Sequence, residues 1–224
     1  MTGLVSTIKK GIWPPEKKGF LLFWRATKAL IKAHVAAYHV LKTTRVDSMV
    51  GIAKDNVDFD STQWNIVGRA IQMFRKKFWN HYFLKNIEGC QDFIGLNYYF
   101  HRHFGYKARE KQSDMGWALF SPAIEHVLKE LTTYNLPIYI TENGIADARD
   151  VHRAKFIREH IEWMKKAMDE GVDVRGYFYW SLLDNFEWDK GFWPRFGLVE
   201  IDYKTMERKV RSSAWEYKKI IQAQ

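Results

Sequence analysis

An alternation of short apolar segments with longer amphipathic stretches constrains the fold of this 224-residue chain more than any other feature. The short segments are rich in β-branched and aromatic residues, which is typical of buried strands; they are residues 46–53, 92–100, 137–141 and 174–182. Apolar residues recur every three or four positions, as in amphipathic helices, over residues 18–43, 61–84, 122–134, 150–171 and 212–221. Strands that alternate with helices predict an α/β fold with a parallel sheet and right-handed crossovers.

The helical spacing also predicts which side chains are buried. In the first helix the expected stripe is Phe20, Phe23, Trp24, Thr27, Leu30, Ile31, His34, Val35, Tyr38 and Leu41. In the second it is Trp64, Val67, Ile71, Phe74, Phe78 and Tyr82. The next two helices are expected to bury Ala123, Val127, Leu128 and Leu131, and Phe156, Ile157, Ile161, Met164 and Met168. Ser61 is the expected cap of the second helix, and Gly171 suits the C-terminal cap of the helix that starts at Asp150.

Polar and aromatic residues gather at or just after the ends of the last three predicted strands. They are Asn97 and Tyr99, then Glu142, then Trp180, Glu187 and Trp188. In a (β/α) barrel the carboxyl ends of the strands form the active-site face. Four strands are half of such a barrel, and no Gly/Ser-rich linker divides the chain. We therefore expect residues 1–224 to form a single partial-barrel domain.

Composition and charge narrow the functional classes. The formal charge is +9, but the basic residues are scattered along helical stretches, which disfavours a nucleic-acid role. The only cysteine is Cys90, and no Cys/His spacing indicates a metal or cofactor, so we expect a buried thiol and neither of those groups. Residues 1–18 lack the apolar core of a secretory signal, and charges interrupt the apolar run 21–40, so we expect a cytoplasmic protein without a membrane span.

The segment 138–144, IYITENG, places Glu142 at the end of an apolar strand. A carboxylate at such a position is costly to bury unless it has partners, which favours a functional role. Gly144 is expected to permit a sharp turn just after it. Taken alone, the segment is equally compatible with an ordinary strand-end glutamate that caps a helix or pairs with an arginine.

The segment 178–188, FYWSLLDNFEW, combines the end of a strand with a loop that offers Asp184, Asn185, Glu187 and Trp188. Indole rings stack on the apolar faces of sugars, and carboxylates accept pairs of hydroxyl hydrogen bonds. The alternative is aromatic core packing beside solvated acids, and a single tryptophan is more often a core residue than a sugar platform.

Together, TENG, WSLLDNFEW and the segment 195–203, RFGLVEIDY, resemble the family-one glycoside hydrolases, the β-glucosidases and β-galactosidases with (β/α)8 barrels. The resemblance extends to residues 92–99, DFIGLNYY, to 113–117, SDMGW, and to 191–203, GFWPRFGLVEIDY, and covers the chain from about Trp13 onward. It implies the C-terminal half of the barrel, with strands five to eight and their helices, acting in hydrolysis of terminal β-linked glucosyl or galactosyl residues with retention of configuration.

The resemblance also implies a role for each residue of the site. Glu142 would be the nucleophile that forms a glycosyl-enzyme, and Tyr99 would support it with a hydrogen bond, which lowers the pKa of a carboxyl group. The implied sugar contacts are Asn97 near the nucleophile, Glu187 on two hydroxyls, Trp188 on another, Trp180 beneath the ring, Phe196 closing the subsite and Trp117 on the aglycone side. The Glu187-Trp188 pair argues against the 6-phospho-sugar branch.

The Asn-Glu-Pro motif that carries the family's acid/base glutamate does not occur in the sequence, and neither do the family's His-Trp pair and the arginine beside the nucleophile. We therefore expect very low activity from the chain alone. We expect it to associate with a complementary N-terminal half-barrel or with itself. The alternative is a non-catalytic half-barrel that only binds carbohydrate. A basic interaction module is a third reading, resting on charge alone.

Overall fold

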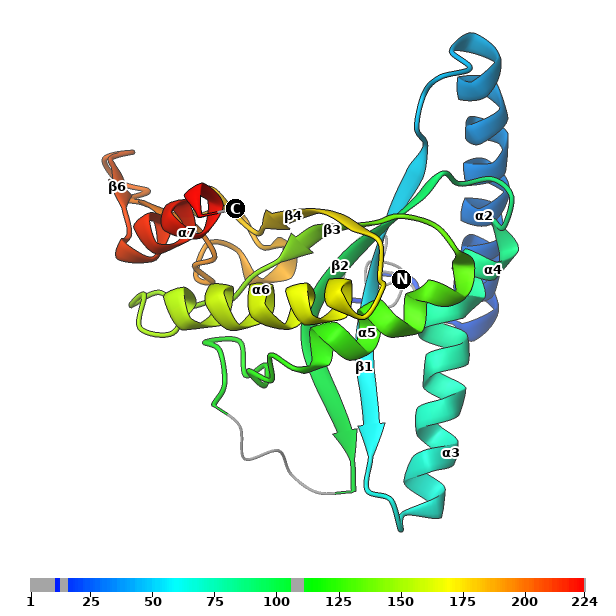
Figure 1. Ribbon diagram of the computed structural model, residues 1–224, viewed down its shortest axis with the longest axis horizontal. Helices are drawn as coiled ribbons and strands as arrows, with labels where there is room; N and C mark the ends of the chain where they lie inside the picture. Colours follow the sequence, from blue (N-terminus) through cyan, green and yellow to red (C-terminus); the bar gives the residue numbers. More distant parts are fainter. Residues whose placement is uncertain (1–10, 13–15, 106–110, 224) are drawn as a thin grey trace.

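The computed structural model describes residues 11–12, 16–105 and 111–223. Its centre is a parallel four-stranded sheet in the chain order β1-β2-β3-β4, which confirms the predicted α/β fold (Figure 1). The strands of this sheet are β1 Gly51–Ser61, β2 Phe93–Phe104, β3 Ile138–Asn143 and β4 Val174–Tyr179. A small antiparallel sheet follows, made of β5 Val199–Ile201 and β6 Arg208–Val210.

Helices lie in each crossover between the strands of the main sheet and at both ends of the described chain. They are α2 Phe20–Thr44, α3 Ile66–Arg75, the π-helical turn η2 Lys76–His81, α4 Tyr82–Asn86, α5 Ala123–Leu131, the 3₁₀ turn η3 Thr132–Tyr134, α6 Arg153–Asp169, the 3₁₀ turn η4 Trp188–Lys190 and α7 Ser212–Gln222. In Figure 1, α5 and α6 run along the sheet, whereas α2, α3 and α4 stand together beside β1. No described helix is long and apolar enough to cross a membrane.

The first predicted strand was placed too early. Residues 46–53 were expected to form it, but β1 starts at Gly51 and continues through polar residues to Ser61. Pairing with β2 explains the extension, because the ladder runs on to the pair Ser61 and Phe104. The polar side chains of this part find partners across the ladder, such as Asp58 with His101 at 2.7 Å. Cross-strand pairing therefore outweighs a composition that disfavours a strand.

The second predicted helix also differs from the structure. Ser61 belongs to β1, and the helix is capped instead by Asn65, whose side chain accepts a hydrogen bond from Gly68 N–H at 2.8 Å. Gly171 follows Glu170, the C-cap residue of α6, and lies in the left-handed region at φ 97°. Its N–H donates to Met168 and that of Val172 to Ala167, the hydrogen bonds of a Schellman motif.

The core lies between the sheet and the helices α5 and α6. The side chains predicted to face inward from these two helices are buried, except that Met168 is 42% exposed. In α2, however, only Phe23 and Thr27 are buried, and the expected face of α3 is largely exposed. The prediction was wrong for Phe20, Leu30, Leu41, Trp64, Val67, Ile71 and Phe74, because no described element covers these faces. Cys90 is partly exposed rather than buried.

The fold predicts a pH dependence of stability through His160, which α6 places in the core. Its ring stacks on Phe156 with a centroid distance of 3.8 Å, and burial lowers its pKa to about 4. An unfolded histidine has a pKa of about 6.5, so the unfolded state takes up the proton first and stability is lost as pH falls from about 6.5 toward 4. Between pH 7 and pH 5 the free energy of unfolding should decrease by about 2 kcal/mol through this residue.

Chemical denaturation at the two pH values tests this expectation. His160→Phe should reduce the loss between pH 7 and pH 5 by roughly that amount, whereas His39→Gln, a substitution on α2, should not. An equal loss in the wild type and His160→Phe would contradict the assignment.

Candidate active site

A cleft of about 410 Å³ lies toward the carboxyl ends of the strands of the main sheet. Its lining contains every residue that the sequence predicted for the site: Asn97, Tyr99, Trp117, Glu142, Trp180, Glu187, Trp188 and Phe196. These residues span a hundred positions of the sequence, and the parallel sheet brings them to one edge because the carboxyl ends of its strands coincide.

Glu142 sits beside β2 because the register between β2 and β3 shifts by one residue. Leu96 pairs with Ile140, but Asn97 pairs with Glu142, so Thr141 is the extra residue of a β-bulge. The Thr141 hydroxyl donates to the Asn97 side-chain oxygen at 2.6 Å. This bond orients the Asn97 amide, which in turn hydrogen-bonds to the Glu142 carboxylate.

The Tyr99 hydroxyl donates to Glu142 Oε2 at 2.6 Å, the short distance expected of a bond to a carboxylate. Burial nevertheless raises the pKa of Glu142 above its usual value, and the negative charge of Asp55 adds to that effect. Hydrogen bonds from Tyr99 and Asn97 lower the pKa but do not fully compensate for the burial. The expected lowering by Tyr99 is therefore present, although the net shift is upward.

The residues after Glu142 lock the neighbouring strands together. The buried Asn143 side chain donates to the Tyr98 carbonyl of β2 at 2.7 Å and accepts from the Tyr177 hydroxyl of β4 at 2.8 Å. Gly144 approaches the Trp180 carbonyl so closely that a Cβ atom there would lie 1.8 Å from the oxygen. Glycine is thus required by this close approach rather than by the sharp turn that the sequence suggested, since the φ of Gly144 is not in the left-handed region.

Three aromatic rings form the wall behind the carboxylate. Tyr99 contacts Trp117 edge to face with a centroid distance of 5.7 Å, and Phe196 lies 6.3 Å from Tyr99 and 6.0 Å from Trp117. Phe196 is only 2% exposed. Such contacts fix the orientation of the Tyr99 ring and hence the direction of its hydroxyl.

The loop after β4 carries the rest of the predicted site. Glu187 precedes the 3₁₀ turn η4, and its N–H donates to the Gly191 carbonyl at 2.7 Å. Burial raises the pKa of Glu187, and the nearby charges of Glu142 and Asp189 add to the shift. Trp188 is 61% exposed, so its indole is accessible from the cleft mouth.

Asp184 holds this loop in place instead of facing a ligand. Its buried carboxylate accepts two hydrogen bonds from the Arg211 guanidinium, both at 3.0 Å, and one from Gly197 N–H at 2.9 Å. Asn185 likewise turns away from the cleft and donates to the Ser181 hydroxyl at 2.9 Å. Of the four residues that the sequence predicted for this loop, Glu187 and Trp188 line the cleft, whereas Asp184 and Asn185 stabilise the fold of the loop.

The structure adds five residues to the cleft that sequence reasoning missed: Asp55, Phe100, Met115, Asp189 and Lys190. Asp55 was missed because the predicted strand ended at Ala53, whereas Asp55 lies inside β1, which continues to Ser61. Phe100 and Met115 lie inside segments that the sequence did single out, at positions where the pattern gave no separate signal.

Removing the Tyr99 hydroxyl should raise the pKa of Glu142 further, because the hydrogen bond favours the ionised carboxylate. The measurement is an NMR titration with ¹³C-labelled glutamate in the wild type and Tyr99→Phe. Tyr139→Phe, a substitution on the same sheet outside the cleft, should leave the Glu142 titration unchanged. A Glu142 pKa that stays constant or falls in Tyr99→Phe would show that the 2.6 Å contact does not stabilise the carboxylate.

Comparisons with known proteins agree with this geometry. The sequence model described as Glycosyl hydrolase family 1 matches residues 103–224, more than half of the chain. The chain is 34% identical to a β-galactosidase of Sulfolobus acidocaldarius, over 93% of this chain and 50% of that protein. It is 31% identical to β-glucosidase A of Thermotoga maritima, over 94% of this chain and 59% of that protein.

Solved structures show the same relationship. A β-glucosidase from Thermotoga maritima in complex with glucoimidazole superposes with a TM-score of 0.90 at 28% identity, over 98% of this chain and 61% of the other. A β-glycosidase from Pyrococcus horikoshii gives 0.89 at 34% identity, over 98% and 58%. The chain thus spans about half to three fifths of the length of these relatives, which confirms a partial barrel. By its sequence and its fold, this chain belongs to glycosyl hydrolase family 1.

Proposed function

We propose that the chain forms the nucleophile-bearing part of a retaining β-glycosidase that hydrolyses terminal β-linked glucosyl or galactosyl residues. The observation that carries the proposal is the cleft itself, which gathers a tyrosine-bonded carboxylate, a second carboxylate and two accessible indoles. The glycosidase names of the relatives and the glucoimidazole bound by one of them agree with this chemistry.

In this proposal Glu142 attacks the anomeric carbon and displaces the leaving group, and water later releases the sugar from the glycosyl-enzyme. Tyr99 has two tasks, since its hydrogen bond keeps the carboxylate ionised and in place. The net upward shift of the Glu142 pKa makes the carboxylate a stronger nucleophile for the first step, and the hydrogen bond from Tyr99 stabilises it as the leaving group of the second step. Glu187 accepts sugar hydroxyls, while Trp180 and Trp188 provide an apolar surface and an indole N–H.

A retaining mechanism needs a second carboxyl group about 5–5.5 Å from the nucleophile to protonate the leaving oxygen. Glu187 is coupled electrostatically to Glu142 and has a raised pKa, but we assign it to the sugar hydroxyls. The sequence holds no Asn-Glu-Pro motif to supply the family's acid. We therefore propose that these 224 residues alone hydrolyse ordinary β-glycosides very slowly, and that the acid comes from a complementary part of the barrel.

A substrate with a strongly activated leaving group tests the nucleophile separately from the missing acid, because such a leaving group needs little protonation. Incubation with 2,4-dinitrophenyl 2-deoxy-2-fluoro-β-glucoside should attach one fluoroglucosyl group to the peptide that contains Glu142, as read by mass spectrometry. Glu142→Gln should abolish the label, and Glu200→Gln, a change at an exposed glutamate outside the cleft, should retain it.

Labelling that persists in Glu142→Gln would contradict the proposed nucleophile. Glucose binding without any labelling would favour the alternative function, a carbohydrate-binding half-barrel without catalysis. That alternative uses the same Trp180, Glu187 and Trp188 surface, so the covalent step is the discriminating observation.

We also propose that a complementary half-barrel covers the apolar faces that the described residues leave open. On α2 these faces include Phe20, Leu21, Leu30, Val40 and Leu41, and on α3 and the segment just before it they include Trp64, Ile66, Val67, Met73 and Phe74. β1 and β4 are the edges of the main sheet, each with one side unpaired by the other described strands. Large apolar patches and open strand edges together mark an association surface.

Light scattering after size exclusion tests this surface. Alone, the chain should self-associate; with a separately expressed N-terminal half of a family-one enzyme it should form a one-to-one complex with greatly increased aryl β-glucosidase activity. Val67→Asp with Phe74→Glu should weaken both kinds of association, whereas Val151→Asp, at an exposed apolar residue elsewhere, should not. A monodisperse monomer that forms no complex with the N-terminal half would contradict the proposal.

A further inference from the structure

The strands β1 and β2 carry a second group of chemically active side chains beyond the cleft. Asp58 pairs with His101 and Asp60 with His103 along the ladder. One residue more lies on β2 than on β1 between the pairs Asn56–Tyr98 and Asp58–His101, so β2 is bulged at this point. The bulge reverses the alternation of side chains: Tyr99 lines the cleft, whereas His101 contacts Phe120 at a centroid distance of 4.7 Å, outside it.

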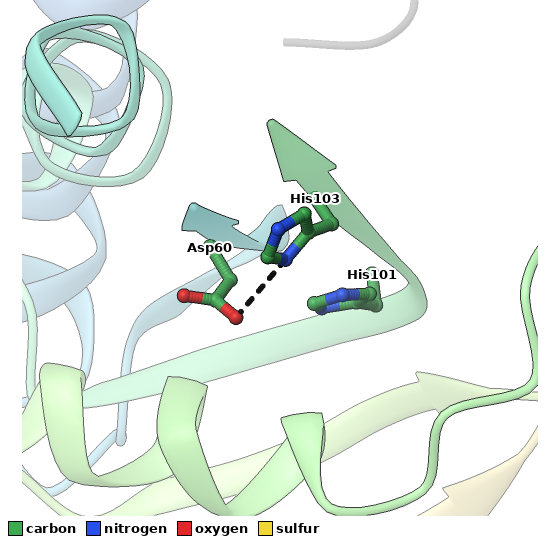
Figure 2. Close-up of side chains that lie close together, drawn as sticks. All are labelled: Asp60, His101 and His103. Carbon is green, nitrogen blue, oxygen red and sulfur yellow. Dashed lines mark hydrogen bonds and ion pairs between the residues drawn. The ribbon is translucent and has the colours of Figure 1, made fainter. Parts of the chain in front are cut away.

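Three potential metal ligands converge on this side of the strands (Figure 2). One ligand atom each from Asp60, His101 and His103 lies within 4.8 Å of the other two. The Asp60 Oδ2 and His103 Nδ1 atoms are 3.2 Å apart. Two ligands bound to one Zn²⁺ ion at 2.0–2.2 Å in tetrahedral geometry lie roughly 3.4 Å from each other, so this spacing already suits a shared ion.

A further carboxylate orients one of the ligands. Asp58 Oδ2 lies 2.7 Å from His101 Nδ1 and 3.4 Å from His126 Nδ1. The Asp58 carboxylate faces Nδ1 of His101 and accepts its hydrogen, so Nε2 is the nitrogen of that ring that is left to bind an ion. A carboxylate behind a histidine is the usual support of a metal ligand.

Burial differs among the three ligands in a way that suits a bound ion. The side chains of His101 and His103 are only 4% and 5% exposed, whereas that of Asp60 is 49% exposed. The histidines are thus held rigidly, and the aspartate leaves an access path from solvent. His103 is further fixed by the Thr62 hydroxyl, 3.1 Å from its Nε2.

We propose that Asp60, His101 and His103 bind a divalent transition-metal ion, with Zn²⁺ as the ion that two imidazoles and one carboxylate suit best. Three protein ligands leave a fourth position for water. The ion joins the carboxyl-terminal extensions of β1 and β2, so its role is to stabilise these strand ends. The site is independent of the glycosidase proposal, because none of its three ligands lines the cleft.

Calorimetric titration of the untagged 224-residue chain with Zn²⁺ tests the site, and Co²⁺ absorption in the visible range reports its geometry. One ion should bind per chain, and saturating Zn²⁺ at about 100 times the dissociation constant should raise the Tm by about 5–10 °C. Asp60→Asn and His103→Gln should each weaken Zn²⁺ binding at least tenfold. Asp58→Asn should weaken it about 10–100-fold by releasing the His101 ring.

Two control variants separate this site from adventitious binding. His152→Gln alters a histidine of another element, and Cys90→Ser removes the thiol that lies 3.8 Å from His39; both should bind Zn²⁺ as the wild type does. Circular dichroism establishes that each variant is folded, and Asp60→Asn is a change at a half-exposed side chain. Absence of one-to-one binding to the wild type would overturn the proposal, as would binding that Asp60→Asn and His103→Gln leave unchanged or that Cys90→Ser abolishes.

Discussion

The buried amide of Asn143 is the interaction on which the geometry of the cleft depends most. This side chain donates a hydrogen bond to the Tyr98 carbonyl of β2 and accepts one from the Tyr177 hydroxyl of β4. The backbone carbonyl of Asn143 accepts a hydrogen bond from the N–H of Trp180 at 2.9 Å. Three adjacent strands are thereby fixed at the point where polar groups must meet. Fully satisfied buried amides define one arrangement of their neighbours, because any slip would leave a donor or acceptor without a partner. Glu142 is the residue immediately before Asn143, so these hydrogen bonds also fix its position.

Two opposing effects set the chemistry of Glu142. Removal from water makes the charged form costly, and hydrogen bonds from Tyr99 and Asn97 recover part of that cost. At Glu187 the effects act in one direction instead, because burial and the negative charges of Glu142 and Asp189 all raise the pKa. Sugar hydroxyl groups placed between Glu142 and Glu187 would donate hydrogen bonds to both carboxylates and so stabilise their ionised forms. The two cleft carboxylates would therefore be stabilised by a ligand rich in hydroxyl donors.

Sequence reasoning located the site better than it located the faces of the helices. Glu142, Glu187 and their aromatic neighbours were found because strand ends in a parallel sheet converge, a rule that needs only the order of elements. Asp55 was missed because the polar composition of residues 54–61 does not predict a strand, although pairing with β2 extends β1 through them. The burial of Leu30 and Phe74 could not be judged from periodicity, because an amphipathic pattern shows that a face prefers a partner and not whether the described chain provides one. Asp184 shows the converse: an acid in a sugar-site motif turned out to be a buried anchor for Arg211.

The central claim is that the cleft formed by the ends of β2, β3 and β4 receives a sugar ring against Trp180 and Trp188. The most direct measurement is the ¹H–¹⁵N NMR signal of each tryptophan indole during titration with a glucose-configured iminosugar, with assignments from single Trp→Phe variants. The account predicts shifts of the Trp180 and Trp188 signals, with the signal of Trp215 on α7 unchanged. Unchanged signals for both cleft tryptophans, or shifts confined to tryptophans outside the cleft, would contradict it.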